Sequence, residues 1–466
     1  MSVVILVADG ARPDTIADAM DAGALPAIAR LRADGHAHTV TSTFPSVTGP
    51  AYAPFLMGRY PGPVGLPALR WFDRARSATS FPHNTRSYVG HEMRKVDDDL
   101  DPDAPTLFEL APPGLAALNM IGRGLPRSGM VGRDVGFVLR AARTHFRGNV
   151  RGWLQIDREI GSTVVRRILA ERPRVTFCAL TGIDKTSHAE GHAAPVVLDG
   201  MRIVDETVAE LRTGLERAGR WESTRLWIVS DHGHSPVAHH EDLAGFVAGL
   251  GHGVVAHPWI YGRGRDVGVM VSGNAMAHLY LELARRERPW WPELAARWEP
   301  LAAALLARPS VDLLMLPHSP DRCEVRAAGR GRAMIERSGG RISYRPETGD
   351  PLGIGELPPC SEREAYDACL TSAYPDAVVQ IAHLAGAARS SEMILSAARD
   401  WDYRSKYEPI PHVSSHGALH REHMLVPLIG NHPVTGTPRR TVDVFPSALA
   451  HLGVAAPTRL DGESFL

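Results

Sequence analysis

VVILVADGARPD, residues 3–14, begins with an apolar run rich in β-branched residues and passes directly into an acidic, glycine-containing turn. Such a run is typical of a strand that is buried on both faces of a parallel sheet. Pro13 suits the first turn of a helix, so the stretch predicts a strand, a turn and a helix. Asp9 then lies just beyond the carboxyl end of the strand, where open α/β sheets form their ligand sites.

Three later strand-like runs end in the same way. They are VTFCALTG (175–182) before Asp184, LWIVS (226–230) before Asp231 and His232, and a short VSS (413–415) before His416. Because the carboxyl ends of parallel strands meet at one edge of a sheet, we expect these side chains to converge on one crevice. Asp184 and His188 are four residues apart, which places both on one side of a helical turn. The convergence is typical of a two-metal hydrolase.

The alternation of strand-like runs with amphipathic segments predicts an α/β fold, with a mostly parallel central sheet flanked by helices. Between residues 262 and 372 the sequence becomes rich in Pro, Gly and Trp, and no long regular strand pattern is visible there. We therefore predict a catalytic core formed by residues 1–261 and 373–466. Residues 262–372 are predicted to form an inserted cap that contributes to substrate specificity.

Composition narrows the class of protein. The 466 residues are 44% hydrophobic, which is enough for a large core. The 51 basic and 52 acidic side chains nearly balance, so the protein has no overall electrostatic potential that would favour binding to nucleic acids or acidic membranes. No apolar stretch is long enough to span a membrane, and no signal-peptide pattern precedes the first strand. The four cysteines lack CxxC spacing, which argues against a disulfide scaffold. We predict a globular cytoplasmic protein that acts on small molecules; its oligomeric state cannot be predicted.

Mixed nitrogen and oxygen ligands favour zinc, with manganese or iron as alternatives. We predict two zinc ions per chain. One would be bound by Asp184, His188 and His416, and the other by Asp9, Asp231 and His232. Taken singly, Asp9 is explained equally well as a helix cap, and a lone histidine in a loop such as His416 is usually structural. Only the combination favours a pair of ions, which stabilises both the attacking and the leaving oxygen of a phosphoryl displacement.

A hydroxyl-rich segment, TSTFPSVTGPAYAPFLMGRYPG (41–62), supplies the candidate nucleophiles. They are Ser42, Thr43, Ser46 and Thr48. We predict Thr48, because it precedes the apolar stretch AYAPFLM, a helix candidate whose free amide groups would favour a phosphoryl oxyanion. A threonine hydroxyl is a poor nucleophile unless a metal activates it, so Thr48 would also be a metal ligand. The alternative is a threonine that only caps the helix.

These segments, in this order, resemble the alkaline phosphatase superfamily, and in particular its type I phosphodiesterase and nucleotide pyrophosphatase branch. The resemblance implies a three-layer α/β/α sandwich, two zinc ions, a covalent phosphothreonine intermediate and retention of configuration at phosphorus. In the family the reactive threonine lies ten residues before the glycine of the GRYP-like segment. Thr48 fits that register relative to Gly58, and Thr43 does not.

The sequence departs from the family at two asparagines. At the position three residues after the nucleophile, where the family has an asparagine, this sequence has Ala51, followed by Tyr52. The second family asparagine is also missing, and Leu69 and Arg70 stand near its expected position. An arginine can bind phosphate in a bidentate manner, which would help a dianionic monoester more than a diester. A surface ion pair with Asp73 is the alternative for Arg70. The substrate-binding residues predicted in this way are Arg70, Tyr52, Lys185 and His192.

We predict hydrolysis of phosphodiester or nucleotide pyrophosphate bonds, with a phosphate ester or nucleotide as the substrate. The alternative is a phosphomonoesterase, or a phosphonate hydrolase related to phosphonoacetate hydrolase. A sulfatase is disfavoured because the Cys-x-Pro-x-Arg segment is absent, and a metal-dependent phosphoglycerate mutase usually employs serine. A member that binds a phosphorylated ligand without catalysis is a third possibility, although every expected metal ligand is present.

Overall fold

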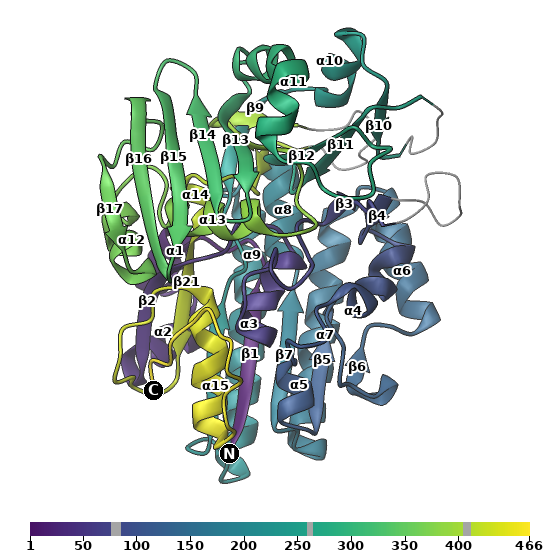
Figure 1. The fold of residues 1–466 in the computed structure, drawn as a ribbon. Helices are drawn as coiled ribbons and strands as arrows, with labels where there is room; N and C mark the ends of the chain where they lie inside the picture. Colours follow the sequence, from purple (N-terminus) through teal and green to yellow (C-terminus); the bar gives the residue numbers. More distant parts are fainter. Residues whose placement is uncertain (76–84, 259–263, 404–411) are drawn as a thin grey trace.

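The computed structural model describes residues 1–75, 85–258, 264–403 and 412–466 (Figure 1). Seven strands in this part of the chain form the central sheet. In spatial order they are β2 (His36–Thr41), β21 (Leu425–Gly430), β8 (Thr224–Val229), β1 (Ser2–Ala8), β7 (Val175–Leu180), β5 (Gly114–Ala117) and β6 (Met130–Val131). β1 is parallel to both of its neighbours, β7 and β8, and only β21 runs antiparallel.

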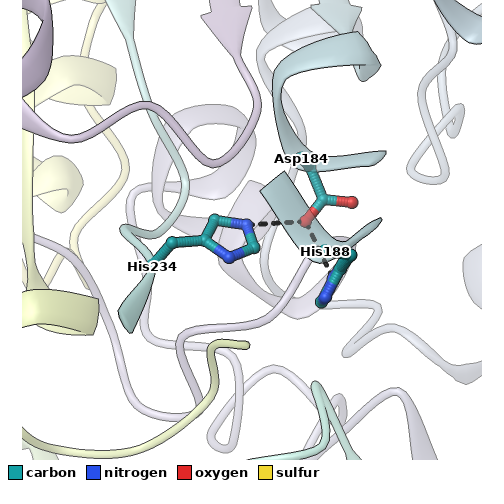
Figure 2. Close-up of side chains that lie close together, drawn as sticks. All are labelled: Asp184, His188 and His234. Carbon is teal, nitrogen blue, oxygen red and sulfur yellow. Dashed lines mark hydrogen bonds and ion pairs between the residues drawn. The ribbon is translucent and has the colours of Figure 1, made fainter. Parts of the chain in front are cut away.

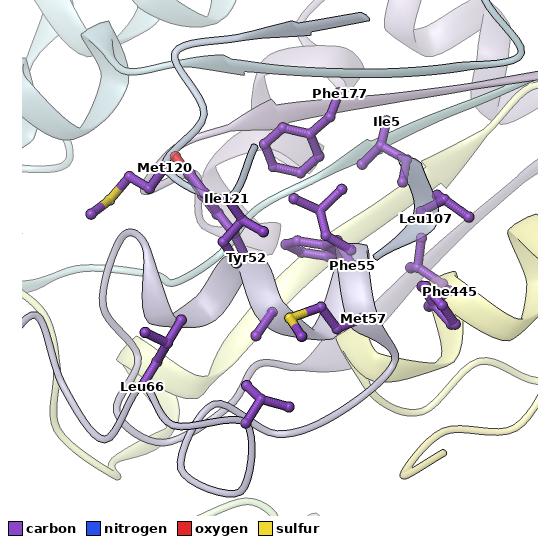
Figure 3. Packing of buried hydrophobic residues seen from close by; sticks show 14 of the residues in the cluster. Ile5, Tyr52, Phe55, Met57, Leu66, Leu107, Met120, Ile121, Phe177 and Phe445 are labelled. Atoms are coloured by element: carbon purple, nitrogen blue, oxygen red, sulfur yellow. The ribbon is translucent and has the colours of Figure 1, made fainter. Parts of the chain in front are cut away.

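Alternate residues of β1 explain why helices cover both faces of this sheet. Val3, Ile5 and Val7 belong to one hydrophobic core, and Val4 and Leu6 belong to another on the opposite face. The first core is closed by α3 (Ala53–Met57), α5 (Leu107–Leu110) and α15 (Val444–Leu452), as Figure 3 shows in part. The second is closed by α1 (Pro13–Asp21), α2 (Pro26–Asp34), α7 (Val150–Glu171), α8 (Gly182–Glu190) and α9 (Pro195–Arg217). The predicted three-layer α/β/α fold is confirmed.

A second sheet packs above the first and is mostly antiparallel (Figure 1). Its nine strands among the described residues are β10 (Val254–Ala256), β11 (Val267–Ser272), β12 (Met276–Leu281), β18 (Met393–Ala397), β13 (Val311–Ser319), β14 (Arg322–Ala327), β15 (Gly331–Ser338), β16 (Arg341–Gly349) and β17 (Leu357–Cys360). α11 (Trp291–Leu306) covers one face, and α12 (Glu362–Cys369) with α13 (Ala377–Gly386) covers the other. This sheet therefore has cores of its own.

The prediction that residues 262–372 lack long regular strands is wrong, because β13 and β16 each have nine residues. Most of the glycines lie in the connections, but prolines such as Pro317 and Pro346 lie within strands, and cross-strand pairing in β13–β16 outweighs the weak local pattern. The boundaries of the predicted cap stay a prediction. Its first boundary, between residues 261 and 262, falls outside the described residues, and β10 and β18 of the same sheet lie on the core side of the predicted limits.

The remaining elements are short or peripheral. They are β3 (Arg70–Phe72) paired with β4 (Thr85–Ser87), β9 (Ser235–His240) between β19 (Asp400–Asp402) and β20 (Ser414–Ser415), and α4 (Val96–Asp99), α6 (Val135–Phe146), α10 (Leu243–Gly249) and α14 (Arg421–Met424). All four cysteines are buried and free, as predicted. Within the described ranges, no helix combines the length and the apolar character needed to cross a membrane.

Candidate active site

Acidic and imidazole side chains gather beyond the carboxyl ends of β1, β7 and β8, the edge predicted from the sequence. The residues described form three groups of donors, and within each group the donor atoms all lie within 4.8 Å of one another. The groups are Asp9 with Asp231 and His232, Asp184 with His188 and His234, and Asp184 with His232 and His416. Every member is buried. Four segments that are distant in sequence, one of them helix α8, therefore supply one cluster.

Thr48 lies beside the first group. Its Oγ1 is 3.1 Å from Nε2 of His232 and donates a long hydrogen bond of 3.4 Å to Oδ1 of Asp9. Nε2 of His232 is also 3.3 Å from Oδ1 of Asp9 and 3.6 Å from Oδ2 of Asp231. As predicted, a short helical segment follows Thr48, first η1 (Pro50–Tyr52) and then α3. Thr48 is half-buried whereas the three charged residues are completely buried, so its hydroxyl lies at the mouth of the cluster.

Asp184 is the centre of the other two groups. Its Oδ1 lies 3.1 Å from Nε2 of His188 and 3.0 Å from Nε2 of His234 (Figure 2). The same oxygen lies 3.6 Å from Nε2 of His416. Its second oxygen, Oδ2, accepts a hydrogen bond of 2.7 Å from Nζ of Lys185. One imidazole from α8 and two from separate connecting segments thus face one carboxylate oxygen.

Backbone carbonyls orient three of these imidazoles. Nδ1 of His188 donates to the carbonyl of Ser414 at 2.9 Å, and Nδ1 of His416 donates to that of Ser46 at 2.9 Å. Nδ1 of His232 donates to the carbonyl of Gly233 at 3.1 Å. A carbonyl can only accept, so in the neutral ring Nε2 has no proton and presents its lone pair to the carboxylates. This arrangement is the usual one for metal-ligating histidines.

Without a bound cation, the cluster buries carboxylates close to one another. Burial and repulsion from Asp9 raise the pKa of Asp231 to about 7. Burial lowers the pKa of His232, but Asp231 and Asp9 outweigh it and raise that pKa to about 9. Among the described residues, both carboxylate oxygens of Asp231 and Oδ2 of Asp9 have no hydrogen-bond partner. Buried carboxylates without partners, facing imidazole lone pairs, fit bound cations.

The grouping of the histidines differs in part from the prediction. Asp9, Asp231 and His232 come together as expected. His416, expected with Asp184 and His188, is grouped instead with Asp184 and His232, and its ring stacks on that of His232 at a centroid distance of 3.5 Å. The sequence analysis missed His234, which lies beside Asp184 and His188. Its spacing was a usable signal, because residues two apart in an extended segment point to the same side.

The predicted substrate-binding residues have different surroundings. Arg70 is half-buried at the start of β3, and its backbone N–H donates to Oγ of Ser272 at 3.1 Å. The side chain of Lys185 is 27% exposed and held by Asp184. His192 is half-buried in the turn after α8. These three roles stay predictions.

Tyr52 is completely buried, and its ring packs edge-to-face on Phe177 with 5.0 Å between the centroids (Figure 3). Its hydroxyl has no hydrogen-bond partner in the described part of the chain. Burial, and then the negative charges of Asp9 and Asp231, raise the pKa of Tyr52 well above its ordinary value. The ring is therefore part of the core, and its burial favours support of the cluster over direct contact with a substrate.

Comparison with known families accounts for this geometry. The family model described as type I phosphodiesterase/nucleotide pyrophosphatase matches residues 3–290, which include most of the cluster. The chain belongs to this family. It is therefore a phosphoric ester hydrolase of a metal-dependent family, as the sequence analysis predicted. None of the curated proteins compared with the chain is similar enough to count as a match.

Solved structures share the fold at low sequence identity. Phosphonoacetate hydrolase from Sinorhizobium meliloti 1021, in complex with phosphonoformate, is 16% identical, with a TM-score of 0.56 over 97% of this chain and 95% of that chain. An inactive variant of murine ectonucleotide pyrophosphatase/phosphodiesterase 5, in complex with AMP, is 14% identical, with a TM-score of 0.57 over 99% and 97%. These likenesses confirm the alkaline-phosphatase-like architecture.

Proposed function

We propose that this family member hydrolyses phosphodiester or nucleotide pyrophosphate bonds through a covalent phosphothreonine at Thr48. The observation that supports this most directly is the position of the Thr48 hydroxyl, within 3.4 Å of both Asp9 and His232 at the mouth of a buried charged cluster. A hydroxyl that meets carboxylate and imidazole groups in this way is an activated nucleophile rather than a helix cap. In agreement, the N-cap residues of η1 and α3 are Gly49 and Tyr52, and the Thr48 hydroxyl contacts Asp9 and His232.

Two zinc ions fit the donors present. Asp9, Asp231, His232 and Thr48 would hold one, and Asp184, His188 and His416 would hold the other. When bound, such ions stabilise the negative charge on the attacking and leaving oxygens of a phosphoryl transfer. Manganese or iron are the alternatives for this donor set.

The proposed reaction has two steps, and Thr48 and Asp9 act in the first. Oγ1 of Thr48 forms a bond to phosphorus as the bond to the leaving oxygen breaks, and the hydroxyl proton passes out through the hydrogen bond to Asp9. Water then attacks the phosphothreonine, which releases the phosphate product and restores the threonine hydroxyl. Two successive displacements give net retention at phosphorus.

A monoester or phosphonate substrate is the second candidate. Ala51 lacks the amide that the family pattern provides, and Arg70 offers a cation that suits a doubly charged phosphoryl group. The likeness of the fold to phosphonoacetate hydrolase is consistent with this reading.

Rates on four substrates separate the candidates. We expect bis-p-nitrophenyl phosphate and a nucleoside monophosphate p-nitrophenyl ester to be hydrolysed faster than p-nitrophenyl phosphate and phosphonoacetate, with zinc quantified in the same sample. A preference for either of the last two would replace the proposed activity with the second candidate. No turnover of any substrate by zinc-loaded protein would favour ligand binding without catalysis.

Arg70→Ala tests the substrate class. If Arg70 binds a dianionic phosphoryl group, kcat/KM on the monoester falls about tenfold or more, because a charge-assisted bidentate contact is lost, while the diester rate changes little. The matched control is Arg140→Ala, which removes a surface ion pair with Glu159. Equal rates in both variants on every substrate would exclude Arg70 from substrate binding.

A further inference from the structure

His234 lies in the cluster but has no place in the family pattern identified from the sequence. Its ring is completely buried between Ser414 and Asp184. The Ser414 hydroxyl donates its only hydrogen to the carbonyl of Ser235 at 2.9 Å. Oγ of Ser414 is therefore the acceptor in its 3.2 Å contact with Nδ1 of His234. This contact fixes the proton of the neutral imidazole on Nδ1.

The opposite nitrogen of His234 consequently presents a lone pair to a carboxylate oxygen. Nε2 lies 3.0 Å from Oδ1 of Asp184, and no proton is left to join the two atoms. His188 repeats the arrangement, because the Ser414 carbonyl fixes its proton on Nδ1 while Nε2 lies 3.1 Å from the same oxygen. The lone pairs of the two Nε2 atoms and the negative charge of Oδ1 of Asp184 repel one another unless a cation lies among the three atoms.

The distances fit a zinc ion at that position. Ligands about 2.0–2.1 Å from a tetrahedral zinc are about 3.3 Å from one another. The three imidazole nitrogens of His188, His234 and His416 lie 3.1, 3.0 and 3.6 Å from Oδ1 of Asp184. The donor atoms of Asp184, His188 and His234 all lie within 4.8 Å of one another, and His416 approaches the same oxygen from the group that it forms with Asp184 and His232.

We propose that His234 is a metal ligand and joins Asp184, His188 and His416 at the second metal position. This inference rests on the proposed function, which needs a cation there. Four protein donors close a zinc site in the manner of structural zinc, whereas three protein donors leave a position open. The ion at Asp184 would then be held more firmly, and it would meet a substrate oxygen by expanding to a fifth ligand, while the position of Asp9, Asp231 and Thr48 stays open.

A positioning role is the alternative for His234. In that case the Ser414 hydroxyl would turn toward Nδ1, and Nε2–H would donate to Asp184 without touching an ion. Glutamine could replace such a donor, since its amide N–H reaches a carboxylate equally well. A glutamine has no imidazole lone pair, so it cannot replace the ligand. His234→Gln therefore separates the two roles.

Cobalt(II)-substituted protein provides a readout that is independent of activity. A histidine bound to cobalt through Nε2 shows a strongly shifted, exchangeable Nδ1–H proton in its NMR spectrum. We expect four such protons in the wild type, from His188, His232, His234 and His416, and three in His234→Gln. If the wild type showed only three shifted Nδ1–H protons and His234→Gln kept all three, His234 would not be a ligand. This result would hold even if other variants fail to fold.

Zinc affinity gives a second measurement. Both His234→Gln and His234→Ala should weaken one of two zinc sites by about 100-fold or more in a chelator competition, since the loss of even an outer partner costs 10–100-fold. The control is His278→Gln, because the nitrogens of this buried histidine contact Ser391 and Pro67 and it belongs to none of the donor groups found in the described part of the chain. Wild-type affinity in His234→Gln would overturn the ligand role. Failure of the wild type to bind zinc or cobalt would overturn the proposed function itself.

Discussion

Thr48→Ala is expected to lower turnover by roughly 10³-fold or more, the scale seen when an enzyme loses its nucleophile. The variant loses the hydroxyl that forms the covalent intermediate, and among the described residues no other hydroxyl contacts both Asp9 and His232. Zinc content should stay near two per chain, because Asp9, Asp231 and His232 remain. Steady-state rates and metal analysis of the same preparation measure both quantities.

Thr43→Ala is the matched control for this experiment. Thr43 is a completely buried hydroxyl of the same segment, but it contacts Oε1 of Gln380 at 3.2 Å rather than the charged cluster. Its loss should leave the rate within a few-fold of the wild type once the folded fraction is taken into account. Full activity in Thr48→Ala, with a large loss in Thr43→Ala, would show that the register of the nucleophile is wrong.

Asp184→Ala should produce the second largest effect, the loss of one zinc ion together with most of the activity. Oδ1 of this residue is the atom on which three imidazoles converge, and its carboxylate also neutralises Lys185. Without this carboxylate, the described donors at the site are neutral imidazoles beside the Lys185 cation, and such a site binds a metal ion far more weakly. Zinc stoichiometry after gel filtration, with rates measured at added zinc, quantifies the change.

Asp205→Asn serves as the control for the loss of a buried carboxylate. Asp205 of α9 is also buried, but it accepts a hydrogen bond from the backbone N–H of Ile28 in α2. Its replacement should leave two zinc ions bound. If Asp184→Ala also retained two ions, Asp184 would not be a ligand, and both metal assignments that depend on it would have to be abandoned.

The catalytic end of the sheet was predictable because its signals are local. A buried strand such as β1 must be apolar throughout, so the first charged residue after it, Asp9, marks the point where the chain leaves the sheet. The same reasoning placed Asp184 and Asp231 after β7 and β8, and these strands are the two neighbours of β1. Short helix turns fixed the pair Asp184 and His188 by spacing alone.

The second sheet was not predictable in the same way. β13 and β15 read as irregular because Pro317 interrupts one, and the other has only a short apolar run with Arg332 before it and Glu336 after it. Their stability comes from cross-strand partners and from α11 and α13, which cover the two faces. The burial of Tyr52 was not predictable either, because the residues near it in the sequence do not show that Phe177 packs against its ring.

The sequence by itself determined the α/β/α class, the family and the chemical identity of the residues at the sheet edge, since strand periodicity and motif spacing are properties of short segments. Only the tertiary structure decided which imidazole faces which carboxylate: His416 stacks on His232, and His234 takes a place beside Asp184. The reason is that the direction of each Nε2 atom depends on the group that binds Nδ1 of the same ring. Those groups, such as the Ser46 carbonyl for His416 and the Ser414 hydroxyl for His234, belong to segments that are distant in the sequence.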